Sequence, residues 1–139
     1  MVIILCCLFL SSCFEVEMHD STSDPIYSSI IGKKFKLKED LLALGVSSDN
    51  KLPADYVVLV AGVGFSGPEV VSRMNLPKGC VFQLDKVLTA KSIMSSKVAY
   101  VFKEIGSNHL KGKEIRATLT SKSDDANYGL DANSFEIVN

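Results

Sequence analysis

LPKGCVFQLDKV, residues 76–87, decides the fold because it joins a turn to an interrupted strand pattern. Pro77 and Gly79 are residues that a type II turn favours. Three residues then share one face of a predicted strand: Cys80, Phe82 and Leu84. The next apolar residue is Val87, which breaks the alternation. An extra residue in one strand of a pair is a β-bulge, so we expect a bulge near Asp85-Lys86.

Downstream of this stretch, alternation between apolar and polar residues continues, as is typical of half-buried strands. KVAYVFKEI and EIRATLT are the next two predicted strands, and their inward residues are Val98, Tyr100, Phe102, Ile115, Ala117 and Leu119. Phe135 and Ile137 predict a last short strand. Polar turn segments separate these strands, which favours a meander of neighbouring strands.

Upstream, KKFKLK places Lys34, Lys36 and Lys38 on one face and Phe35 and Leu37 on the other. This pattern predicts a strand, and exposed lysines are typical of a sheet edge because their charge discourages pairing with another sheet. The alternative is that the lysine row binds an anionic partner. We favour the solvated edge.

The segments between residues 40 and 76 give a mixed prediction. Asp40 to Val46 fits either a strand or a short helix closed by Gly45. Tyr56 to Ala61 is β-branched and apolar on both faces, which predicts a strand in the centre of the sheet. Pro68 to Leu76 predicts about two helical turns, with Pro68 at the first helical position.

Together these segments predict an all-β domain over residues 26–139, with five or six short strands and one short helix. A small barrel or a sandwich would satisfy this pattern. The order of a strand, a long excursion, a Pro-Gly turn and three meandering strands resembles an SH3-like barrel. LPKGCVFQLDKV is similar to the start of the central meander in such domains. The resemblance implies a fold and no activity.

The N-terminal segment MVIILCCLFLSSC carries no charge and is almost wholly apolar through Leu10. It is too short to span a membrane but has the length of the apolar region of a signal peptide. Leu10-Ser11-Ser12-Cys13 resembles the lipobox of bacterial lipoproteins. The resemblance implies cleavage before Cys13, a signal peptide over residues 1–12 and a lipid on Cys13. The alternative is a buried N-terminal strand that ends in Cys13.

Residues 13–25 are polar and acidic after the cysteine, so we expect a flexible tether between lipid and domain. Phe14 follows the cysteine directly. In enterobacterial lipoproteins an Asp at that position often retains the protein at the inner membrane, so its absence here favours the outer membrane. Cys80 would be the one cysteine of the mature domain, so we expect no internal disulfide. His19 and His109 are isolated in the sequence, and we expect no metal site.

VVLVAGVGFSGPEVV, residues 57–71, has the G-x-G-x-x-G spacing of a dinucleotide-binding turn at Gly62, Gly64 and Gly67. Asp85 follows near the distance at which an acidic residue would hold the ribose. The predicted helix after Gly67 is too short for a crossover, and no second crossover helix follows, so we favour a tight bend at the end of a strand. Phe65 and Ser66 would then lie on a loop tip as contacts for a partner, unless Phe65 folds into the core.

The net charge of −1 argues against nucleic acid as a partner. No nucleophile is paired with a base in the sequence, and the acidic loop with Asp124, Asp125 and Asp131 lacks the spacing of an EF-hand. We therefore expect a non-catalytic lipoprotein without a small-molecule cofactor. It would be anchored in the cell membrane or outer membrane, face the periplasm and bind a protein of the cell envelope. An immunity protein against a periplasm-directed toxin is the favoured role, an accessory or assembly subunit of an envelope machine the first alternative, and a nucleotide-binding or enzymatic domain built on the glycine turn the second.

Overall fold

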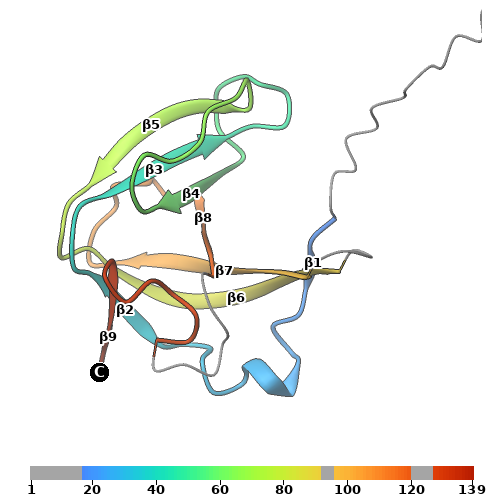
Figure 1. Cartoon of the computed structure of the whole chain (residues 1–139), viewed down its shortest axis with the longest axis vertical. Coiled ribbons are helices and arrows are strands. Elements are labelled where there is room, and N and C mark those ends of the chain that lie inside the picture. The colour runs from blue at the N-terminus through green and yellow to red at the C-terminus, as the bar shows by residue number, and fades with distance from the viewer. Residues whose placement is uncertain (1–16, 92–95, 120–126) are drawn as a thin grey trace, which may run out of the picture.

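Nine β-strands form one strongly bent sheet in the computed structural model, which describes residues 17–91, 96–119 and 127–139 (Figure 1). The elements are β1 (His19–Asp20), the 3-10 helix η1 (Pro25–Tyr27), β2 (Lys34–Leu37), β3 (Leu41–Val46), β4 (Tyr56–Val60), β5 (Val70–Leu76), β6 (Val81–Lys91), β7 (Ser96–Ile105), β8 (Glu114–Thr118) and β9 (Phe135–Val138). These ranges contain no α-helix. The predicted all-β fold class is confirmed, although the strands are more numerous than the five or six expected.

Hydrogen-bonded neighbours follow the order β5-β3-β4-β8-β7-β6-β2-β9, and β1 pairs with β6. Only β4 and β8 run parallel among the paired strands of the described ranges. The sheet ends at β5 and β9 and is not closed into a barrel. Figure 1 shows it curling so that an upper half, β3 to β5, lies across from a lower half, β2, β6, β7 and β9.

The core lies between the two halves and is aromatic on one side and aliphatic on the other. The lower half contributes buried side chains from Phe35, Leu37, Phe82, Leu84, Val87, Tyr100, Phe102 and Phe135. The upper half contributes Leu41, Ala43, Val57, Leu59 and Leu76. The buried residues of the lower half are inward positions that the alternation predicted, whereas no inward face was predicted for the strands of the upper half.

Two sequence predictions about the sheet are confirmed. The pairing of β6 with β7 shifts register between Leu84 and Lys86, where the bulge is predicted, and Val87 is buried after it. β4 lies between β3 and β8, as its apolar sequence predicted. The segment 40–46, which fitted either a strand or a helix, forms strand β3.

The helix predicted over Pro68 to Leu76 is wrong, because residues 70–76 form β5. Pro68 and Glu69 carry local signals for a helix start, but Val70 and Val71 are β-branched and favour a strand. β3 provides the deciding interaction, since β5 pairs with it antiparallel from Val70 to Leu76 and Leu76 is fully buried. A partner this distant in sequence is invisible to local propensity.

The edge position predicted for KKFKLK is also wrong, because β2 lies between β6 and β9. Phe35 and Leu37 are buried as expected. Two of the lysines have partners within the domain: Lys36 pairs with Glu136 at 3.0 Å, and Lys38 Nζ donates to the Ala132 carbonyl at 2.8 Å. Two lysines of the row that was predicted to be a solvated edge or an anion-binding face thus bind groups of β9 and of the loop before it.

Residues 19–22 are hydrogen-bonded to β6, within the segment 13–25 that is predicted to be a tether. Ser21 N–H donates to the Val87 carbonyl at 2.9 Å, and Val87 N–H donates to Thr22 Oγ1 at 3.1 Å. A flexible tether that starts at Cys13 would therefore end before His19. The lipobox-like residues 10–13 lie outside the described residues.

Candidate functional site

Residues 61–69 form a loop that carries the chain from β4, on one side of β3, to β5 on the other side. Gly62 and Gly64 have φ angles of +83° and +76°, a backbone conformation that glycine adopts without strain. A Cβ at Gly64 would lie 3.1 Å from Leu42 Cδ2, so the loop packs closely on the outer face of β3. The glycines therefore form the tight bend that the sequence favoured. The helix that a dinucleotide turn requires does not follow Gly67, because β5 begins at Val70.

Phe65 and Ser66, the predicted partner contacts, both lie at the surface of this loop. The Phe65 side chain is 42% exposed and does not belong to the buried core cluster. Arg73 on β5 holds the loop, because its Nη2 donates to the Phe65 carbonyl at 2.9 Å. Val63 at the same tip is 93% exposed. The loop thus presents two apolar side chains next to β5.

β5 has an apolar groove on its other face. A cavity of about 270 Å³ lies there, and its apolar lining comes from Ala43, Leu52, Pro53, Ala54, Val57, Met74 and Leu110. Leu52 and Met74 stand exposed at its rim. Sequence reasoning missed this groove because its walls come from β3, β4, β5 and two loops that are distant in the chain.

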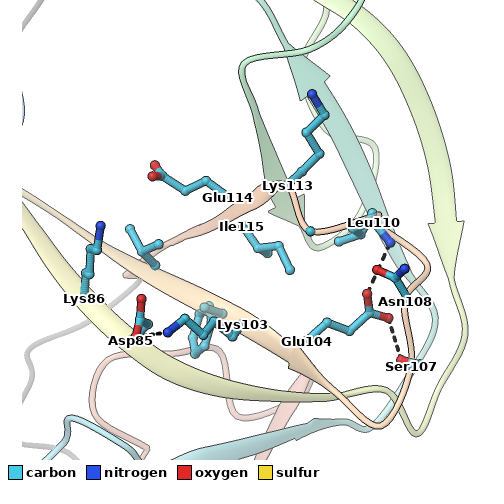
Figure 2. A pocket seen from close by; sticks show the side chains of 13 residues that line it. Asp85, Lys86, Lys103, Glu104, Ser107, Asn108, Leu110, Lys113, Glu114 and Ile115 are labelled. Carbon is cyan, nitrogen blue, oxygen red and sulfur yellow. Dashed lines mark hydrogen bonds and ion pairs between the residues drawn. The ribbon is translucent and has the colours of Figure 1, made fainter.

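A second cavity, of about 430 Å³, lies beside the β6 bulge, β7 and β8, and its lining is charged (Figure 2). Lys103 pairs with Asp85 at 2.7 Å, and Lys113 Nζ donates to the Ala54 carbonyl at 2.8 Å. Glu114 pairs with Arg116 outside the cavity. Most charges that line this cavity are therefore already satisfied by protein groups.

Glu104 on β7 organises the loop between β7 and β8. Its carboxylate accepts hydrogen bonds from Ser107 Oγ at 2.5 Å, from the N–H groups of His109 and Leu110 at 3.1 and 3.2 Å, and from His109 Nδ1 at 2.6 Å. Figure 2 shows Ser107 and Leu110 bound to this carboxylate. Ser107 donates to a carboxylate and not to an imidazole, so this cluster does not have the order of a serine–histidine–acid triad.

Cys80 lies beside the same group, with its Sγ 3.8 Å from His109 Nδ1. His109 is isolated in the sequence, but the fold brings it against Cys80 and Glu104. His19 is exposed on β1.

The carboxylate and the thiol respond to this environment in opposite directions. Burial alone would raise the pKa of Glu104, but the hydrogen bonds from Ser107, His109 and the loop N–H groups together lower it. Burial raises the pKa of the Cys80 thiol, and the negative charges of Glu104 and Asp40 add to that effect. The cluster thus combines a neutral thiol with an ionised carboxylate.

Sequence reasoning also missed Glu104, although the alternation along β7 carries a signal for it. Val98, Tyr100 and Phe102 alternate inward, and Glu104 is the next residue of the same series. Its side chain is only 6% exposed, as that position predicts. A carboxylate on a buried face needs hydrogen-bond donors or a positive charge beside it, so a Glu at this position indicates a polar cluster.

Comparisons with protein-family models, with curated proteins and with solved structures found no match. Among the described residues, no helix has both the length and the apolar character to cross a membrane. Cys13 and the acidic pair Asp124-Asp125 lie outside the described ranges. Asp131 is described, and its carboxylate accepts from Ser134 Oγ and from the Asn133 N–H, so it holds its own turn.

Proposed function

We propose that this chain is a lipid-anchored, non-catalytic protein-binding domain that faces the periplasm. The anchor would be Cys13, on the strength of the apolar segment before it and the lipobox-like Leu10-Ser11-Ser12-Cys13. Cys13 lies six residues before the start of β1 at His19, so the two are at most about 21 Å apart at ~3.5 Å per residue. Such a short connection would hold the domain against the membrane and raise its local concentration there.

The observation that carries the binding proposal is the position of β5 at the end of the sheet. Among the described strands, only β3 is paired with β5, and β5 extends over seven residues without a proline or a lysine. An edge of this kind can receive an extended partner segment as an additional strand. Phe65 and Val63 on one side and the apolar groove at Met74 on the other would contact the side chains of that segment.

The pairing on β3 indicates which backbone groups of β5 are available. The Val46 carbonyl accepts a hydrogen bond from Asp55 on the β4 side. Neighbouring residues of an antiparallel strand alternate in the side to which their backbone groups point. Leu42 therefore also points towards β4, and Asn75, its partner on β5, directs its N–H away from β3. Asn75 is a donor that an incoming strand would use.

The experiment is affinity capture from a detergent-solubilised envelope fraction, with two pairs of variants. Asn75→Pro removes the outward donor, which an edge strand tolerates, whereas Asn75→Ala keeps it. Phe65→Ala removes the loop-tip ring, and Ser66→Ala tests the neighbouring position. We expect Asn75→Pro and Phe65→Ala to lose the partner that the wild type and Asn75→Ala retain, with unfolding midpoints close to that of the wild type. Equal capture by all variants would refute β5 as the binding edge.

The partner's identity decides the role. A toxin domain would support the favoured role of an immunity protein, and a structural envelope component would support an accessory or assembly subunit. Intact-mass measurement on the same eluate, with Cys13→Ser as the control, tests the anchor separately. Acyl chains on a chain cut before Cys13 are expected, and an uncleaved, unacylated chain would contradict the anchor without affecting the test of β5.

A further inference from the structure

Three metal-ligating atoms from two distant segments of the chain meet at the start of β6. Cys80 Sγ, a Glu104 carboxylate oxygen and His109 Nδ1 all lie within 4.8 Å of one another. We propose that these three side chains bind a zinc ion.

The chemistry of the three donors selects the metal. A thiolate, an imidazole and a carboxylate are all common zinc ligands, and the soft thiolate disfavours Mg²⁺ and Ca²⁺, which prefer oxygen ligands alone. One thiolate and one carboxylate would also balance the charge of a divalent ion. Binding would release the proton of the Cys80 thiol, as is usual when a thiol becomes a ligand.

The distance between Cys80 and His109 is close to that of a tetrahedral site. Zinc bond lengths place a sulfur and a nitrogen ligand about 3.6 Å apart, and Cys80 Sγ lies 3.8 Å from His109 Nδ1. Two lighter ligands would lie about 3.3 Å apart, so the 2.6 Å separation between His109 Nδ1 and Glu104 Oε1 must lengthen. The imidazole would replace its hydrogen bond to Glu104 with a bond to the ion and carry its proton on Nε2. His109 is partly exposed in a loop, which leaves room for this small rotation.

The backbone holds the three ligands without help from a metal. Glu104 lies opposite Phe82 in the pairing of β6 with β7, and Cys80 shares the face of Phe82, so Cys80 and Glu104 are diagonal neighbours. The hydrogen bonds from the His109 and Leu110 N–H groups to Glu104 fix the loop that carries the imidazole. The ligands are therefore preorganised by strand register and by loop capping.

An open side remains for a fourth ligand. A cavity of about 260 Å³ borders Cys80, Ile105, Ser107 and His109 and opens to solvent. Three protein ligands with an accessible fourth position is the arrangement in which zinc retains a water molecule. We therefore assign water as the fourth ligand.

The test is titration of the detergent-solubilised full chain with Co²⁺, which reports on thiolate ligands by its charge-transfer absorption, and then with Zn²⁺ in competition. Cys6, Cys7 and Cys13 are replaced by Ser in all samples, so Cys80 is the one thiol of the four cysteines that remains. Cys80→Ser and His109→Gln remove proposed ligands. His19→Gln is the matched control, because the chain has two histidines and His19 lies on β1, where no such cluster occurs among the described residues.

We expect one Co²⁺ per chain with a thiolate charge-transfer band, displacement by Zn²⁺, and loss of the band in Cys80→Ser. His109→Gln should weaken binding at least about tenfold, the lower end of what loss of outer-shell support alone produces. His19→Gln should match the background chain. Absence of the band from the background chain overturns the proposal even if a variant fails to fold. Equal weakening by His109→Gln and His19→Gln also overturns it.

Discussion

Phe102 on β7 and Met74 on β5 belong to the same sheet but have opposite surroundings. Phe102 is 2% exposed, and its ring centroid lies 5.9 to 6.5 Å from those of four other rings: Phe35, Phe82, Tyr100 and Phe135. Met74 is 42% exposed at the rim of a groove. The lower half of the sheet thus provides a packed aromatic support, whereas the upper half exposes apolar surface beside an open strand edge. In this domain the less tightly packed half is the one to which we propose that a partner binds.

Truncation of Phe102 should have the largest effect on stability. Phe102→Ala removes a ring that contacts four others, and a buried Phe→Ala change typically lowers the free energy of unfolding by about 3–5 kcal/mol. Met74→Ala should change it by about 0.5 kcal/mol or less, as exposed positions do. Chemical denaturation of both variants measures the contrast. Comparable losses would mean that the upper half is as tightly packed as the lower half.

The sequence predicted the inward faces of the lower half well because alternation is a local signal, although it wrongly placed β2 at an edge of the sheet. Leu84 and Val87 revealed the bulge by their spacing alone, and the alternation around Tyr100 and Phe102 identified the inward face. For the upper half the prediction was wrong at β5. Local signals at Pro68 favoured a helix there, but pairing with β3 makes the segment a strand. Strand pairing between distant segments cannot be read from one segment's propensity.

The candidate sites show the same division. The sequence predicted that Phe65 lies on an exposed loop beside glycines, and it does. This prediction succeeded because glycines are a local signal of a bend, and Gly62 and Gly64 indeed have positive φ angles. The cluster at Cys80 required two segments 29 residues apart to meet, and the free edge of β5 required the order of all the strands. The cluster and the free edge both result from the order of the strands, which no local sequence motif predicts.

A pair of glycine substitutions should have an intermediate effect and tests how tightly the loop is packed on the upper half. Gly62→Ala and Gly64→Ala both place a side chain at positive φ, which costs about 1–2 kcal/mol. Gly64→Ala should lower the free energy of unfolding further, because its Cβ would approach Leu42, whereas nothing lies within 4 Å of the corresponding position at Gly62. Denaturant unfolding gives the difference. Equal losses would show that the loop does not pack on β3.

The smallest effect is expected at Asp55, just before β4, and it appears only in acid. The N–H and then the hydroxyl of Ser48 donate to this carboxylate, at 2.8 and 3.0 Å, and lower its pKa below the ordinary value of 3.8. A lowered pKa in the folded state means that the stabilisation is fully present above the ordinary value and is lost as the pH falls through the folded-state pKa. Unfolding midpoints measured from neutral pH into that range should therefore fall slightly more steeply for the wild type than for Asp55→Asn.

Asp20 on β1 is the counterpart on the lower half, since the hydroxyl and then the N–H of Thr22 donate to it and lower its pKa. Asp20→Asn should flatten the same acid transition if both halves unfold together, because each carboxylate then contributes to one cooperative equilibrium. If the packing contrast instead divides the domain into separate units, tyrosine near-ultraviolet circular dichroism should respond to Asp20→Asn and not to Asp55→Asn when both are made in a Tyr56→Phe background, which removes the one tyrosine of β3 to β5. Comparison of the two aspartate variants therefore tests whether the upper and lower halves of the sheet unfold as one cooperative unit.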